Sequence, residues 1–144
     1  MNFLANDKLT RVEPAAAAAQ TLLTSDVVDM AGFDSLTFIA FLGDVLDTAV
    51  LTLQAQQGDQ SDGSDATNLA GVLATFTADA TSADNNMLAL EVARPTKRFL
   101  RVTLTRATAN AAVDGIIAVQ SNPAEAPVVQ DASVLATKFA LSPV

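Results

Sequence analysis

The feature that most constrains this chain is a series of short apolar segments separated by clusters of Asp, Asn, Gly and Ser. Residues 49–56 show it most clearly, because Leu51, Leu53 and Ala55 alternate with polar side chains. A period of two places alternate side chains on opposite faces of a strand, so this segment predicts a half-buried strand. No segment has the spacing of a long amphipathic helix. The sequence therefore predicts an all-β fold.

Further segments of this kind cover most of the chain. Residues 36–42 are apolar on both faces, which is typical of a central strand covered on each side. The remaining segments that we expect to form strands are residues 27–30, 69–78, 87–93, 99–106 and 116–119. Short strands joined by turns, about eight in all, predict a single-domain β-sandwich of the jelly-roll kind.

Two local features refine this prediction. Residues 87–93 and 99–106 have matching apolar faces and are joined by a turn that contains Pro95, which predicts a β-hairpin. Residues 15–19 are consecutive alanines. This alanine run is too short to form an independent helix, and it fits either a brief helical turn or a loop flanked by strand.

The composition also predicts where the sandwich begins and ends. We expect residues 1–24 to form an N-terminal arm, residues 25–120 the β-sandwich core, and residues 121–144 an extended C-terminal arm. The C-terminal arm is rich in proline, and short strands are predicted within it at residues 128–129 and 134–141. Such an arm can add a strand to a neighbouring subunit or cover an edge of its own sheet, and both interpretations stay open.

The missing residue types exclude much chemistry. The chain has no His, Cys, Trp or Tyr, so a Ser-His-Asp triad, a thiol nucleophile and a zinc site of the usual kind are all absent. We therefore expect no enzymatic activity, no cofactor and no bound metal. A net charge of −8 argues against a nucleic acid partner. No signal peptide or membrane-spanning stretch is evident, so we expect synthesis in a host cytoplasm and no membrane partner.

The segment Asp59–Asp65 has the Asp, Ser and Gly content of a calcium loop. Its spacing does not follow the EF-hand pattern, because the twelfth position counted from Asp59 is Ala70, where that pattern requires Glu. A solvated loop is the favoured interpretation, since these residue types are common in loops. Cation binding remains the alternative.

Basic side chains are concentrated in one part of this acidic chain. Five of the eight lie within residues 94–106, around the predicted hairpin. Such a cluster can bind an acidic partner surface, while the alternative is a solvated edge whose charge prevents aggregation. We favour partner binding, and the residues concerned are Arg94, Lys97, Arg98, Arg101 and Arg106.

Several stretches of this sequence resemble a family of small virion proteins encoded by tailed bacteriophages and prophages. Together they span most of residues 26–135. The stretches are VARPTKRFLR (92–101), RATANAAVDGIIAVQ (106–120), APVVQ (126–130), DMAGFDSLTF (29–38) and LQAQ (53–56).

The resemblance implies a capsid decoration (cement) subunit, located on the capsid surface of a virion. It further implies that the protein binds copies of itself to form a homotrimer, and that it binds the major capsid protein. We expect Phe38, Ile39 and Phe41, on the strand that is apolar on both faces, to take part in self-association. A tail or fibre-base component of the virion, and a receptor- or carbohydrate-binding module, remain as alternatives.

Overall fold

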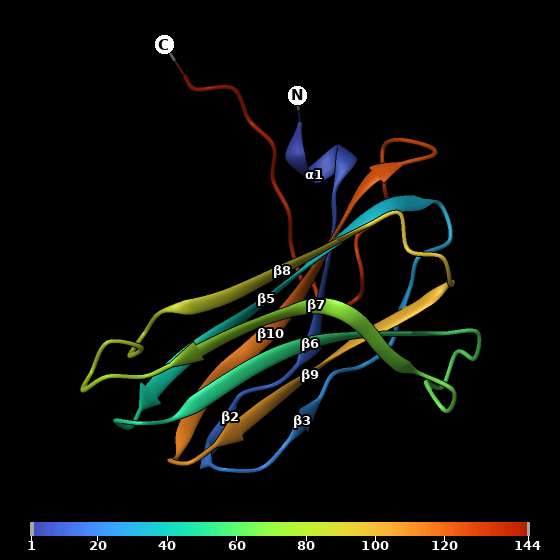
Figure 1. Ribbon diagram of the computed structural model, residues 1–144. Helices are drawn as coiled ribbons and strands as arrows, with labels where there is room; N and C mark the ends of the chain where they lie inside the picture. The colour runs from blue at the N-terminus through green and yellow to red at the C-terminus, as the bar shows by residue number, and fades with distance from the viewer. Residues whose placement is uncertain (1, 144) are drawn as a thin grey trace.

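Two antiparallel sheets pack face to face in the computed structural model, which describes residues 2–143 (Figure 1). The first sheet has the order β1-β10-β5-β8, with β2 also paired to β10, and the second has the order β3-β9-β6-β7, with β4 also paired to β9. One short helix, α1 (Phe3–Asn6), precedes them. The strands are β1 (Lys8–Glu13), β2 (Ala16–Ala19), β3 (Leu23–Thr24), β4 (Val28–Asp29), β5 (Phe33–Val45), β6 (Val50–Gly58), β7 (Thr67–Thr77), β8 (Met87–Ala93), β9 (Phe99–Ala107) and β10 (Ala111–Pro123).

The strand order is that of a jelly roll. When β1 and β2 are counted as one interrupted strand, and β3 and β4 as another, eight strands divide equally between the two sheets. After β5 the chain makes β6 and β7 in the second sheet, returns to the first for β8, crosses to the second for β9 and returns for β10. Eight strands arranged in two sheets by such crossings are the jelly-roll architecture. The predicted fold class is confirmed.

The core lies between the sheets and is built from the alternating positions that the sequence marked. Leu51, Leu53 and Ala55 of β6 are fully buried, and Phe38 at the centre of β5 is also fully buried. The register places Leu53 opposite Leu104 of β9, so the two strands present their apolar side chains to the same layer. Apart from Phe38, small aliphatic residues fill most of this layer.

The predicted hairpin between residues 87–93 and 99–106 is wrong. β8 pairs with β5 in the first sheet, whereas β9 pairs with β6 in the second. Both strands do present an apolar face to the core, but they do so from opposite sides of it. Matching apolar faces are equally satisfied by strands that face one another across a sandwich, so periodicity alone could not distinguish the two arrangements.

The first 24 residues differ from the predicted N-terminal arm, because they contain three strands of the sandwich. β1 and β2 extend the first sheet along β10, and β3 extends the second along β9. The alanine run forms β2, in which Ala16 and Ala19 pair with Val113 and Ala111. The long strands β9 and β10 supply the backbone partners that a short segment lacks by itself, so tertiary pairing overrides the helical preference of alanine.

The C-terminal arm also differs from the prediction. β10 continues to Pro123, and residues 124–143 contain none of the short strands expected at 128–129 and 134–141. Proline and exposed polar residues leave the arm without the continuous backbone pairing that a strand requires.

The first half of this arm covers the edge of its own sheet. The N–H of Leu9 on β1 donates to the side-chain oxygen of Gln130 at 2.7 Å, and the N–H of Arg11 donates to the Ser133 hydroxyl at 2.9 Å. Side chains therefore satisfy the exposed backbone of β1, which protects this edge from pairing with another chain.

Substitution Phe38→Ala should lower the free energy of unfolding by about 3–5 kcal/mol, because it opens a cavity in the centre of the core. Phe41→Ala removes the same group from the same strand on the opposite, half-buried face, and should cost clearly less. Urea denaturation followed by circular dichroism, at low protein concentration, measures both. Equal losses for the two variants would contradict the assigned faces of β5.

Candidate functional site

The outer face of the first sheet is apolar. On β5 the residues between the buried ones point outward, and Ile39 at its centre pairs with Ile117 of β10 on one side and Ala89 of β8 on the other. These side chains and their neighbours form one continuous surface, which we call the outer apolar face. Its members are Leu9, Ile39, Phe41, Met87, Ala89, Ile117 and Val119.

The outer face of the second sheet is mostly polar, although Val50 and Leu73 also lie on it. Thr52 lies between Thr75 and Thr105 in the register, and the hydroxyls of Thr52 and Thr75 are 3.1 Å apart. Farther along, Gln56 pairs with Arg101, whose Nε donates to the Gln56 side-chain oxygen at 2.8 Å. The two sheets therefore differ on their outer surfaces, and only the first has the character of a protein contact surface.

Two of the three residues predicted for self-association lie on the outer apolar face. Ile39 and Phe41 point outward and are half-buried. Phe38 is a correction, because it is fully buried between the sheets and cannot contact another molecule. Successive residues of a strand point to opposite faces, so three neighbouring positions cannot all serve one surface.

The sequence analysis overlooked the other half of this face. Ile117 and Val119 of β10 lie directly beside Ile39 and Thr37 of β5. The signal was present in the run from Ile116 to Val119, which is apolar at successive positions just as residues 36–42 are. Two adjacent strands with this property make a sheet that is apolar on both sides.

The basic residues near β8 and β9 are mostly bound by the chain itself. Lys97 Nζ lies 2.7 Å from Asp59 Oδ2, and the Arg98 guanidinium contacts both carboxylate oxygens of Asp29 at 2.8 and 2.9 Å. The hydrogen bond from Arg98 is the largest cause that holds the pKa of the Asp29 carboxyl below its ordinary value of 3.8. Arg94 is exposed, and its side chain has no hydrogen-bond or ion-pair partner within residues 2–143.

Arg106 is not part of any exposed basic surface, which corrects its assignment to partner binding. Its side chain is buried at 2% exposure. The guanidinium donates to the backbone oxygens of Ala17, Thr21 and Ala111 and to the Thr21 hydroxyl, at 2.6–3.0 Å. It therefore ties the segment around β2 to β9 and β10, and burial lowers its pKa.

The loop at residues 59–65 uses its carboxylates internally. Asp65 accepts hydrogen bonds from the backbone N–H groups of Asp59 and Gln60, and Asp62 accepts one from Ser64. These hydrogen bonds lower the pKa values of both carboxyls. Across the described part of the chain, no three acidic residues gather as a metal site requires.

No protein-family model and no curated protein matches this chain. Solved structures of similar fold include the infectious bursal disease virus VP2 subviral particle, with a TM-score of 0.44 and 13% identity, covering 82% of this chain and 31% of that one. Another is the Eiger TNF from S. frugiperda, with a TM-score of 0.40 and 8% identity, covering 86% and 98%. A third is the desmodium yellow mottle tymovirus, with a TM-score of 0.32 and 10% identity, covering 89% and 90%.

This chain thus spans less than a third of the VP2 chain. The jelly-roll assignment rests on the strand order described above and not on these distant likenesses. Within residues 2–143, no helix has the length and apolar character that crossing a membrane demands.

Arg106→Met should destabilise the fold by about 2–4 kcal/mol, because three backbone carbonyls lose a buried donor. Arg94→Met serves as the matched control and should change the free energy of unfolding by no more than about 0.5 kcal/mol, as is usual at exposed positions. Urea denaturation measures both. A similar loss in the two variants would contradict the contrast between these arginines.

The Arg98–Asp29 pair should make a small contribution to stability that depends on pH. Because the folded-state pKa of Asp29 is lowered, the contribution is present above pH 3.8 and is lost as the pH falls through the lower, folded-state value. Both side chains are about half exposed, so solvent screens the pair and Arg98→Met should cause only a small loss of stability at pH 7. Thermal unfolding of both proteins from pH 7 to pH 2 should show their difference shrinking under acid conditions, and a difference that grows instead would contradict the assignment.

Proposed function

We propose that this protein is a structural subunit of a virus particle, namely a decoration subunit that binds copies of itself and the major capsid protein. The observation that carries the proposal is the outer apolar face, which continues across four strands of the first sheet and includes polar neighbours such as Thr37 and Glu91 at its margin. Exposed apolar surfaces of this extent are typical of contacts with other proteins. The resemblance to small phage virion proteins over most of residues 26–135 supports the choice of a virus particle as its location.

The stabilising role follows from the thermodynamic linkage between binding of the subunit and assembly of the shell. A protein that binds the assembled shell but not its separated parts stabilises the shell by its binding free energy. That contribution recurs at each equivalent position of a symmetric lattice. A sandwich with a close-packed core presents its contact surface in a fixed geometry, which this role requires.

In this proposal the outer apolar face mediates self-association into a homotrimer. The basic residues of the link between β8 and β9 bind an acidic surface of the shell. Arg94 has no ion-pair partner within residues 2–143. Lys97 and Arg98 keep 40% and 60% of their side chains exposed while they are paired with Asp59 and Asp29. The protein acts through binding and not through catalysis, on the capsid surface of the virion.

Shells assembled without this protein, from the phage that encodes it, test the role directly. Purified protein is added to them and the particles are imaged by cryo-electron microscopy. We expect regularly spaced density on the outer surface of the head. Density at the tail would favour a tail or fibre-base component, and specific binding in a glycan screen without attachment to particles would favour a receptor-binding module.

Ile39→Asp should convert the predicted trimer to monomer without unfolding it, because it places a charge in the centre of the outer apolar face. Thr52→Asp introduces the same group at the centre of the other sheet's outer face and should leave the trimer intact. Analytical ultracentrifugation measures the mass, and circular dichroism checks the fold. An unchanged mass for folded Ile39→Asp would overturn the assignment of this face to self-association.

A further inference from the structure

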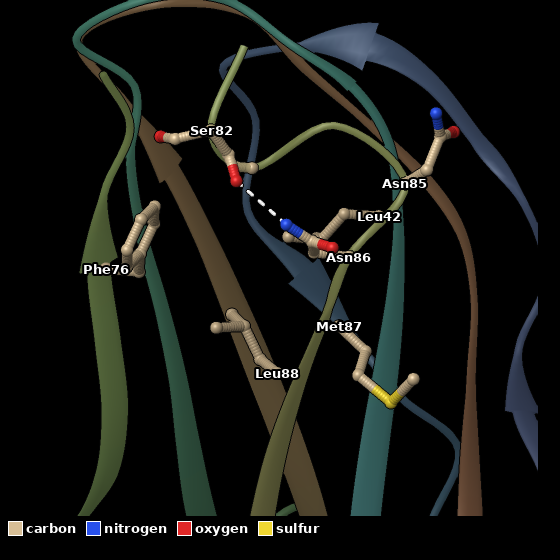
Figure 2. Close-up of a pocket in the computed structure, with 8 residues that line it drawn as sticks. Leu42, Phe76, Ser82, Asn85, Asn86, Met87 and Leu88 are labelled. Carbon is tan, nitrogen blue, oxygen red and sulfur yellow. Dashed lines mark hydrogen bonds between the residues drawn. The ribbon is translucent and has the colours of Figure 1, made fainter. Parts of the chain in front are cut away.

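The sandwich has an open apolar gap along one side, between the edge strands β7 and β8. Phe76 of β7 lies on the core-facing side, since its register partner is the buried Leu51, yet it remains 40% exposed. Leu88 of β8 is half-buried and points into the same gap, while Met87 points the other way (Figure 2). These core-facing side chains are incompletely covered because the first sheet ends at β8.

The backbone of β8 is also unpaired on its outer side. At one end of the strand the N–H of Arg94 donates to the Asp34 carbonyl of β5, and at the other the Asn86 carbonyl accepts from the N–H of Leu42. Backbone groups in an antiparallel pair point alternately toward and away from the partner. The residues whose backbone groups point away from β5 are therefore Met87, Ala89, Glu91 and Ala93.

The end of the chain has the pattern of a strand without a partner. Leu135, Phe139 and Leu141 are 95%, 57% and 82% exposed. No hydrogen bond or ion pair joins residues 135–143 to the rest of the described chain, and this segment runs away from the sheets (Figure 1). Its odd-numbered residues are Leu, Thr, Phe, Leu and, at the end, Pro, while its even-numbered ones are Ala, Lys, Ala and Ser. Such alternation is typical of a strand with one buried face.

We propose that residues 135–143 of one copy add as a strand to the free edge of β8 in a neighbouring copy, with Lys138 beside Glu91. The two segments match on both faces in this register. Lys138 lies between alanines on one face and Glu91 lies between alanines on the exposed face of β8. The apolar side chains of the added strand then continue the core-facing row of Leu88, Leu90 and Val92 and cover the gap at Phe76.

The neighbour, and not the same chain, is the acceptor because of where the arm is anchored. Ser133 is held to Arg11 on β1, at the opposite edge of the first sheet from β8. Reaching the free edge of β8 from β1 covers four strand spacings, or about 19 Å, which uses about six extended residues. Those residues would include Leu135 and Lys138, which the proposed pairing requires beside β8.

In a trimer each subunit gives its arm to the next one, so this contact is heterologous, and the proposal requires that its repetition closes a ring after three copies. The inference rests on the proposed self-association and specifies how the subunits hold one another. It also gives Lys138, which has no role in the outer apolar face, a defined partner.

Disulfide trapping tests the contact, because the chain has no native cysteine. Full-length Glu91→Cys and Lys138→Cys proteins are prepared separately, mixed, allowed to exchange subunits and oxidised. We expect a covalent dimer on non-reducing gels only in the mixture. Adjacent residues on paired strands lie within the distance that a disulfide spans. The matched control mixes Lys138→Cys with Thr52→Cys, which lies on the outer face of the other sheet and should give no dimer.

The outcomes separate this inference from the proposed function. A trimer that forms normally but gives no Glu91–Lys138 cross-link overturns the inference and leaves the proposed self-association standing. A protein that carries both Glu91→Cys and Lys138→Cys gives a further test. If its disulfide forms only within one chain, the arm belongs to its own sheet, and the inference is overturned. If the wild-type protein forms no oligomer, both the inference and the proposed self-association are overturned.

A second measurement uses the affinity of the subunits. Phe139→Asp should weaken trimer formation roughly tenfold to a hundredfold, the equivalent of one buried aromatic side chain. Leu22→Asp, at a residue of similar exposure on the opposite part of the sandwich, is the control and should leave the dissociation constant unchanged. Equal effects in the two variants, measured by sedimentation, would overturn the inference.

Discussion

The structure depends on one requirement, which is that every strand buries its inward-facing side chains against the opposite sheet. Phe38 occupies the middle of this layer, and small aliphatic residues fill the space around it. Two buried polar side chains near the ends of this layer have backbone partners. Arg106 meets the carbonyls around β2, and the Gln120 amide donates to the carbonyl of Asp29 at 2.8 Å. The interrupted strands at the beginning of the chain are thus held to the long strands by buried polar contacts as well as by the ladder.

Much of this arrangement could be predicted from the sequence, because the successes rest on local patterns, whereas the failures concern contacts between distant segments. The alternation in residues 49–56 identified a strand and its buried face, because period two is a property of single strands. The partner of each strand was harder to predict. Residues 87–93 and 99–106 lie in different sheets, since a shared apolar layer can be reached from either side. The alanines of β2 gave no strand signal, because their pairing with β10 depends on residues nearly a hundred positions away.

The candidate site was predicted only in part, for the same reason. Ile39 and Phe41 could be placed on an outer surface, but Leu9 and Ile117 join them only through the register of three strands. The basic cluster illustrates the opposite error. Charges close together in sequence looked like one surface, whereas the fold pairs Lys97 and Arg98 with acids from distant loops and buries Arg106. The asymmetry between the outer surfaces of the two sheets is the property on which the proposed self-association rests.

The pairing of β1 with β10 places Lys8 opposite Gln120, and β3 and β4 likewise pair with the late strand β9. Contacts that join such distant positions close large loops, and folds built on them form slowly. During synthesis the opening segment has to wait, unpaired, until β9 and β10 have left the ribosome. The sandwich therefore closes in one late step, in which the early strands acquire their partners together.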